Sequence, residues 1–120
     1  MARILVCDDD PSVRQLLEVT LSFDHEVTLA EDGQQALDAL AADPDIDLLV
    51  LDVMMPVKDG ITTLRELRAD PSMAGLPIVM LTAKAQEADI SAGVAAGADH
   101  YMTKPFDPLE LEQLIERLVG

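Results

Sequence analysis

Short unbroken runs of apolar residues recur along the chain and are separated by longer, more polar stretches. Unbroken runs of about four apolar residues are typical of strands buried on both faces, as in a parallel sheet. Three such runs predict buried strands at residues 4–7, 48–51 and 78–81. Residues 27–30 alternate weakly, which is consistent with an edge strand, and residues 100–102 give only a poor strand signal.

The stretches between these runs place apolar residues every three to four positions, as amphipathic helices do. The first two stripes are Val13, Leu16, Leu17, Thr20 and Leu21, followed by Ala36, Leu37, Leu40 and Ala41. Two later stripes are Ile61, Leu64, Leu67 and Arg68, and then Leu111, Leu114, Ile115 and Leu118. An alanine-rich stretch at roughly residues 86–96, ending at Gly97, predicts the fourth helix. Asp10, Asp32 and Asp107 are expected to cap helix starts.

The predicted elements are therefore a strand and a helix in alternation, five times over, with short connections. This order favours right-handed crossovers and a parallel sheet with helices on both faces. The predicted fold class is α/β, a doubly wound (βα)5 sheet. The 120 residues contain no linker, repeat or low-complexity tract. We therefore expect one domain over residues 1–120, with no room for a separate output or catalytic domain.

The charge balance excludes several functions. The chain has 23 acidic residues against 8 Lys and Arg, a formal net charge of −15. A domain with this much negative charge repels phosphates and anionic lipid. We therefore expect no direct binding to nucleic acid or membranes. The 49% apolar content argues against disorder. Nothing resembles a secretory signal or a membrane span, and Cys7 has no disulfide partner, so we expect a cytoplasmic protein.

Reactive side chains follow four of the predicted strands at the points where the strands end. They are Asp8 and Asp9, Asp52, Thr82 and Lys104. Ligands of open α/β sheets bind beyond the carboxyl ends of the strands, so we expect these side chains to converge. Each has a common structural explanation, such as a helix cap, a turn or a solvated loop. Their coincidence at four strand ends favours a shared site.

The three aspartates, Asp8, Asp9 and Asp52, would repel one another and raise their pKa values unless a cation lies among them. Carboxylate oxygens on loops suit Mg²⁺, and the ammonium group of Lys104 is a second remedy. Asp52 is then a candidate nucleophile that forms an acyl phosphate. Thr82 and Lys104 are candidates for binding the phosphoryl oxygens.

The motifs that carry these residues resemble those of response regulator receiver domains of bacterial two-component signalling. The matching segments are ILVCDD at 4–9, LDVMMP at 51–56 with DG at 59–60, MLTA at 80–83, and GADHYMTKPF at 97–106. The resemblance covers essentially the whole chain, and its motifs are specific in combination. It implies a flavodoxin-like, CheY-like fold with strand order 2-1-3-4-5.

The resemblance also implies roles for the residues of the site. Asp52 would accept a phosphoryl group from a phosphohistidine of a sensor histidine kinase or phosphotransfer protein. Asp9, Asp52 and the backbone carbonyl of Met54 would bind Mg²⁺ or Mn²⁺, with Asp8 acting through a metal-bound water. Lys104 would pair with the phosphoryl group, and the peptide bond after Lys104 would be cis.

A conformational switch is implied as well. After phosphorylation the Thr82 hydroxyl would bind a phosphoryl oxygen, and Tyr101 would turn inward. The surface of the fourth helix, fifth strand and fifth helix would then change and control an unknown output domain or partner protein. The same face could form a phosphorylation-dependent dimer, although it has few basic residues for an ionic network.

The chain departs from the family pattern near the phosphoacceptor. Val57 and Lys58 stand where the family often has a glycine after the proline, which leaves the conformation of this loop open. Met54 and Lys84 occupy positions that tune dephosphorylation in the family. Neither is a carboxamide or an acid that would orient an attacking water, so we expect a long-lived phosphoryl group.

Three other functions compete with this interpretation. A haloacid-dehalogenase-like phosphatase also uses an aspartyl phosphate and Mg²⁺, and residues 8–10 fit its D-x-D pattern, but Asp52 would then be idle. A flavodoxin-type carrier would need phosphate-binding hydroxyls where this chain has aspartates. A pseudo-receiver would lack the complete set of site residues. A stand-alone regulator and a receiver from a longer protein both remain open.

Overall fold

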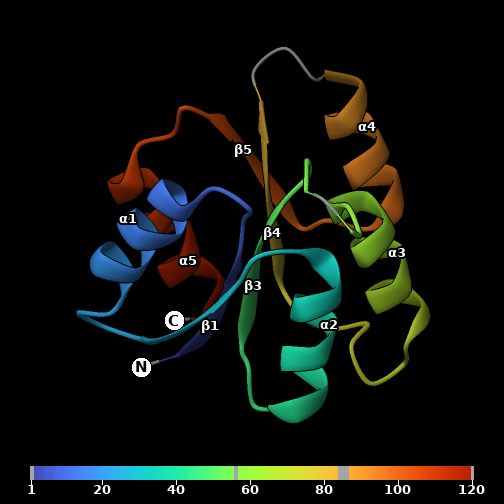
Figure 1. Cartoon of the computed structure of the whole chain (residues 1–120), viewed down its shortest axis with the longest axis horizontal. Helices are drawn as coiled ribbons and strands as arrows, with labels where there is room; N and C mark the ends of the chain where they lie inside the picture. The colour runs from blue at the N-terminus through green and yellow to red at the C-terminus, as the bar shows by residue number, and fades with distance from the viewer. Residues whose placement is uncertain (1, 56, 84–86, 120) are drawn as a thin grey trace.

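Parallel strand pairing organises the structure, a computed structural model that describes residues 2–55, 57–83 and 87–119 (Figure 1). The strands are β1 (Arg3–Cys7), β2 (Glu26–Ala30), β3 (Leu48–Asp52), β4 (Ile78–Ala83) and β5 (His100–Lys104). Within the described ranges they form one sheet in the order β2-β1-β3-β4-β5, and each neighbouring pair is parallel. The expected α/β fold and strand order are confirmed.

Helices cover both faces of this sheet. They are α1 (Pro11–Leu21), α2 (Gly33–Ala42), α3 (Gly60–Ala69), α4 (Glu87–Ala96) and α5 (Pro108–Val119). Helices α1 and α5 lie on one face, and α2, α3 and α4 lie on the other (Figure 1). Because successive strand residues point to opposite faces, each strand supplies two separate aliphatic cores. Leu49 and Met80 belong to the core beneath α2, α3 and α4, which we call the α2–α4 core. Val50 and Leu81 belong to the core beneath α1 and α5.

The strand predictions hold best where the apolar run is unbroken. Strands β1, β3 and β4 contain the three predicted runs, and the apolar residues of those runs are buried. Strand β2 lies at one edge of the sheet and is mostly exposed, which agrees with its weak alternation. Strand β5 extends from His100 to Lys104, beyond the poor signal at 100–102, because pairing with β4 rather than its own pattern makes it a strand.

Two residues that the helical stripes placed on buried faces are exposed. Leu16 is 44% exposed, because α1 packs on the sheet through Leu17 and Leu21. Ala41, at the end of α2, is exposed as well. Thr63 of α3 is instead fully buried, and its hydroxyl donates a hydrogen bond to a backbone carbonyl of the preceding turn. A short helix on one face of a sheet buries a narrower stripe than the apolar pattern predicts.

Helix ends follow the predicted caps. The side chains of Asp10, Asp32 and Asp107 each accept a hydrogen bond from a backbone N–H in the first turn of the helix that follows. Asp59 does the same for α3. Gly97 follows α4 with a φ of 107°, the left-handed conformation that glycine adopts at low cost. Over the described ranges, no helix combines the length and apolar character that crossing a membrane requires.

Candidate functional site

The carboxyl ends of β1, β3 and β5 bring three of the candidate side chains into contact. Asp8 directly follows β1, Asp52 ends β3 and Lys104 ends β5. The Nζ atom of Lys104 lies 2.7 Å from Oδ2 of Asp8 and 3.3 Å from Oδ1 of Asp52. One ammonium group therefore joins two carboxylates from different strands, one of them 96 residues away in the sequence.

Three carboxylates crowd this edge of the sheet. Asp8, Asp9 and Asp52 each contribute an oxygen that lies within 4.8 Å of the other two. Asp8 is 0% exposed and Asp52 is 4% exposed, whereas Asp9 is open to solvent. Two of the three like charges are therefore held away from the water that would otherwise stabilise them.

Burial and charge act in opposite directions on Asp52. Removal from water raises its pKa, the neighbouring Asp8 charge raises it further, and Lys104 lowers it, with a result of about 7. Burial would lower the pKa of Lys104, but its hydrogen bond to Asp8 and the charges of both aspartates raise that pKa above its ordinary value. Lys104 therefore stays charged, yet by itself it does not restore an ordinary pKa to Asp52.

The position of Asp8 is held by contacts that the sequence did not point to. Its Oδ1 accepts a hydrogen bond from the backbone N–H of Asp10 at 2.9 Å. Its backbone carbonyl accepts a hydrogen bond from Nη1 of Arg14 at 2.7 Å, and the same guanidinium lies 3.4 Å from Glu31. Arg14 orients the chain at the site without facing it. A basic residue one turn into the helix after the acidic run was the available signal.

The aspartate cluster fits a hard divalent cation. Mg²⁺ and Mn²⁺ prefer oxygen ligands, and one carboxylate oxygen from each of the three aspartates lies close enough to share an ion. Burial and the Asp8 charge raise the pKa of Asp52 despite Lys104, so a cation among the carboxylates would stabilise the charged form of Asp52. The Met54 side chain is 58% exposed, and the role of its backbone carbonyl as a ligand stays a prediction.

The loop between β3 and α3 is shaped by close backbone contacts. Gly60 donates its N–H to the carbonyl of Val53 at 2.9 Å, and a Cβ at residue 60 would collide with the backbone of Asp52. Lys58 accepts a hydrogen bond from the N–H of Gly33 at 3.0 Å. Val57 has a φ of 66°, a left-handed conformation that is strained for a β-branched residue. The departure from the family's glycine therefore falls on the residue whose backbone needs one.

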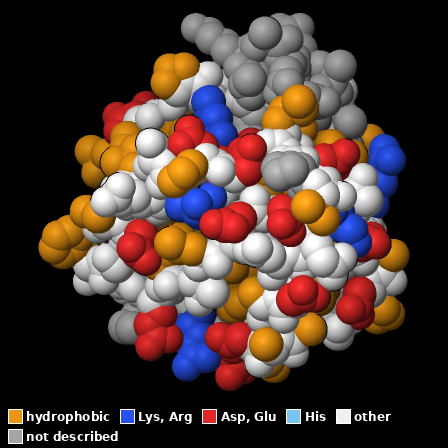
Figure 2. All heavy atoms as spheres, viewed as in Figure 1, with side chains coloured by type: hydrophobic (Ala, Val, Ile, Leu, Met, Phe, Trp, Pro, Cys, Tyr) orange, Lys and Arg blue, Asp and Glu red, His pale blue; other side chains and the backbone are white. Residues whose placement is uncertain are grey.

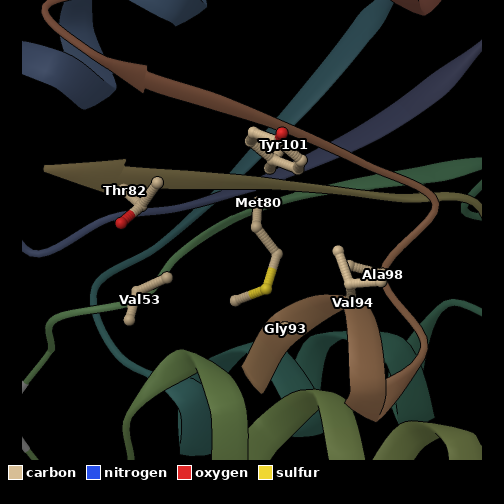
Figure 3. Close-up of a pocket in the computed structure, with 7 residues that line it drawn as sticks. All are labelled: Val53, Met80, Thr82, Gly93, Val94, Ala98 and Tyr101. Atoms are coloured by element: carbon tan, nitrogen blue, oxygen red, sulfur yellow. The ribbon is translucent and has the colours of Figure 1, made fainter. Parts of the chain in front are cut away.

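The two switch candidates lie on β4, which pairs with β3, and on β5 beyond it. Thr82 of β4 is 1% exposed, and Tyr101 of β5 is 49% exposed, so the ring lies partly in solvent in this structure. A small cavity that both residues line lies between α4 and the sheet (Figure 3). The peptide bond between Lys104 and Pro105 is cis, as expected. Lys84, the second candidate for tuning dephosphorylation, lies outside the described residues.

Acidic side chains cover much of the surface around the helices. Figure 2 shows them scattered across the face in view, between hydrophobic and other side chains, with fewer Lys and Arg side chains among them. This distribution agrees with the formal net charge of −15 and would repel a polyanion.

Known proteins share both the sequence pattern and the fold. Residues 4–116 match the profile of the response regulator receiver domain family. The response regulator MprA of Mycolicibacterium vanbaalenii is 48% identical over 117 residues, which is 97% of this chain and 48% of that protein. MprA of Mycobacterium tuberculosis is 49% identical over 117 residues, again 97% of this chain and 48% of that protein. The chain thus spans about half the length of these curated relatives.

Solved structures give the same result. The chemotaxis protein CheY4 of Vibrio cholerae superposes with a TM-score of 0.89 at 34% identity, covering 98% of both chains. The receiver domain of a Pseudomonas aeruginosa sensor histidine kinase, which has a magnesium ion coordinated in its active-site cleft, gives 0.89 at 35% identity and covers 99% of this chain and 98% of that one. Because the sequence match spans nearly the whole chain and the folds agree, the chain belongs to the response regulator receiver domain family of two-component signalling.

Proposed function

We propose that this chain is a phosphoacceptor in which Asp52 accepts a phosphoryl group from a phosphohistidine of a sensor histidine kinase or phosphotransfer protein. The observation that carries the proposal is the position of the Asp52 carboxylate. It is 4% exposed, it lies at a strand end 3.3 Å from Nζ of Lys104, and it has an oxygen within 4.8 Å of oxygens of Asp8 and Asp9. This arrangement combines a nucleophile with a cation and two metal-binding carboxylates at one point.

The chemistry is a transfer of the phosphoryl group between two nucleophiles. A carboxylate oxygen of Asp52 forms a bond to phosphorus while the bond between phosphorus and the histidine nitrogen breaks. The imidazole leaves with the electron pair of that bond and takes up a proton. Lys104 offsets negative charge on the phosphoryl oxygens, because its ammonium group already lies 3.3 Å from Asp52.

The acidic cluster supports metal-assisted transfer. Asp9, Asp52 and the Met54 carbonyl would hold Mg²⁺ or Mn²⁺, with Asp8 acting through a water. When bound, such an ion neutralises charge on the phosphoryl oxygens and on the attacking carboxylate. The magnesium ion in the Pseudomonas receiver structure supports the same use of the cluster in this chain.

Phosphorylation would switch the surface made by α4, β5 and α5. It adds about −2 charge beside Asp52. The Thr82 hydroxyl would donate a hydrogen bond to a phosphoryl oxygen, and Tyr101 would turn from its half-exposed position into the protein. The changed surface would control an unknown output domain or partner, or form a phosphorylation-dependent dimer, in the cytoplasm. The acidic surface supports the expectation that this chain itself does not bind nucleic acid or a membrane.

The phosphoryl group is expected to be long-lived. The side chains of Met54 and Lys84, which would tune its hydrolysis, do not orient water as an acid or a carboxamide would. Substitution of Met54 by glutamate should therefore speed phosphate release, measured by the loss of radiolabel over time. The expectation would be contradicted if the phosphoryl group of the wild type had a half-life of seconds and substitutions at Met54 and Lys84 did not change that half-life.

Labelling with acetyl phosphate tests the phosphoacceptor directly. With Mg²⁺, the wild-type chain should gain the mass of one phosphoryl group, and Asp52→Asn should gain none because the nucleophilic carboxylate is gone. Asp38→Asn, which removes a carboxylate from the exposed side of α2, is the matched control and should label like the wild type. Unchanged labelling of Asp52→Asn would overturn the proposal.

A further inference from the structure

A small cavity lies between α4 and the sheet, beside Thr82 and Tyr101 (Figure 3). Its volume is about 10 Å³, which is roughly the room that one water molecule needs. An aromatic ring cannot enter such a space unless a side chain that lines it moves. The residues around the cavity therefore decide whether the inward movement of Tyr101 can take place.

Met80 is the lining residue best suited to move. In the parallel pairing of β4 with β5 it lies opposite Tyr101, so both side chains leave the sheet on the face that α4 covers. Met80 is 2% exposed and belongs to the α2–α4 core. Its unbranched thioether has three rotatable bonds and adapts to irregular space more easily than the β-branched Val53, which also lines the cavity.

Gly93 of α4 sets the position of that thioether. Figure 3 shows the Met80 side chain extending from β4 toward the helix at Gly93. A Cβ at residue 93 would lie 2.8 Å from the Met80 sulfur and 3.7 Å from Cδ1 of Ile61. The first distance is too short for a carbon and a sulfur atom, so a side chain at residue 93 would push the thioether away from the helix.

We propose that Gly93 is a positioning residue: because it has no side chain, it leaves room beside α4 for the Met80 thioether, so that the cavity can widen and receive the Tyr101 ring when Asp52 is phosphorylated. This inference rests on the proposed function, because the inward movement of Tyr101 belongs to it. It adds the steric control of the switch: the absence of a side chain at residue 93 permits the movement, and Met80 transmits the effect.

The composition of the chain provides a specific probe. The sequence has one tyrosine and no tryptophan, so intrinsic fluorescence reports on Tyr101 alone. Beryllofluoride with Mg²⁺ serves as a phosphoryl mimic. In the wild-type chain it should lower the acrylamide quenching constant by about half or more, because the ring passes from 49% exposed to buried. In Gly93→Ala the constant should stay at its value without beryllofluoride.

Two control variants separate the steric effect from other causes. Gly75→Ala adds a methyl group where no atom lies within 4 Å, and it should respond like the wild type. Alanine also strengthens a helix by about 1 kcal/mol relative to glycine, which could stiffen α4. The double variant Gly93→Ala/Met80→Val keeps that alanine but removes the atom it meets. Beryllofluoride should therefore lower the acrylamide quenching constant of the double variant, as it does in the wild type.

Labelling of Asp52 by acetyl phosphate, measured by intact mass on the same samples, distinguishes this inference from the proposed function. All the variants should label equally, because neither residue 93 nor residue 80 supplies a group to the proposed phosphoacceptor site. Equal labelling with a wild-type fall in quenching in Gly93→Ala would overturn the role of Gly93 and leave the phosphoacceptor standing. Absence of labelling in the wild type would overturn the proposed function itself.

The double variant decides the mechanism of the effect. If it folds, as thermal melting will show, and yet remains unresponsive, then contact with Met80 is not the cause and the proposal is wrong. If Met80→Val prevents folding, Gly93→Ala still tests the role of residue 93: a wild-type fall in its quenching constant overturns the proposal, and loss of that fall supports it. A side chain at 93 must abolish the response, and one at 75 must not.

Discussion

Asp52 is held under opposing influences that suit a reactive carboxylate. Burial and the neighbouring Asp8 raise its pKa, Lys104 lowers it, and the net result is a pKa of about 7. A carboxylate in this state is poorly stabilised by its surroundings, so it gains from binding a cation. Natural sites of this kind commonly trade stability for function.

This conflict predicts a stability change in Asp52→Asn. A carboxyl group whose pKa rises from 3.8 to about 7 on folding costs the native state stability as pH rises through that interval. Without divalent cations at pH 8, the variant should therefore be more stable than the wild type by about 1–3 kcal/mol. The difference should shrink as pH falls from about 7 toward 4, where the native wild type becomes protonated. Urea unfolding in EDTA at several pH values measures it.

Asp38→Asn is the control for this comparison, since an exposed substitution should change stability by less than about 0.5 kcal/mol. A variant at Asp52 that is less stable than the wild type at pH 8 in EDTA would show that Lys104 outweighs burial and Asp8.

At the residue scale, the sequence could predict which reactive side chains converge, because residue type and position at a strand end are local features. Asp8, Asp52 and Lys104 could be chosen because each follows a strand, and the structure brings them within ion-pair distance. The roles of Arg14 and Gly60 were not predicted, although Gly60 belongs to the matching DG segment at 59–60. Arg14 donates to a backbone carbonyl and Gly60 acts by the absence of a side chain, so residue type alone indicates neither role.

At the scale of elements, the end of β3 is positioned by its contact with the start of α3. Gly60 lies so close to the backbone of Asp52 that no side chain fits between them. Its N–H also donates to the carbonyl of Val53, which turns the chain back over the strand end. The hydrogen bond between Gly60 and Val53 therefore joins the two ends of the loop that carries the strained Val57. This geometry makes the position of the Asp52 carboxylate depend on α3.

Gly60→Ala should therefore disturb the site through the backbone. The added methyl must displace the end of β3, and overpacking of this kind costs about 1–3 kcal/mol of unfolding free energy. Labelling of Asp52 by acetyl phosphate should slow as well, because its carboxylate moves relative to Lys104. Gly75→Ala, in open space, should change neither quantity. Wild-type stability and labelling in Gly60→Ala would show that the contact does not position the site.

The whole molecule carries an excess of negative charge that its bases do not balance. Within the described residues, ion pairs engage five of the bases: Arg3, Arg14, Lys58, Arg68 and Lys104. The formal net charge of −15 therefore leaves many acids facing one another across a small surface. Mutual repulsion of this kind destabilises a compact state and is screened by salt.

Stability should accordingly rise with ionic strength. Raising NaCl from about 0.01 M to about 0.5 M shortens the range of the repulsion several-fold and should increase the unfolding free energy by about 1 kcal/mol or more. Urea unfolding in EDTA measures the effect apart from divalent-ion binding. The double variant Glu18→Gln/Asp24→Asn, which neutralises two exposed acids, should show a weaker salt dependence. Stability that falls with added NaCl would contradict this account.

The sequence by itself determined the order of the elements, the helix caps and the strand ends that carry the chemistry. These features depend on periodicity and residue type over a few neighbouring positions. Only the tertiary structure decided that β5 is a full strand, that Leu16 faces solvent and that Asp52 has a pKa of about 7. Each of these depends on which distant residues come within contact, and local pattern carries no information about distances between elements. The proposed role of Gly93 is hidden from the sequence for the same reason. It depends on the Met80 sulfur, which would lie 2.8 Å from a Cβ at residue 93.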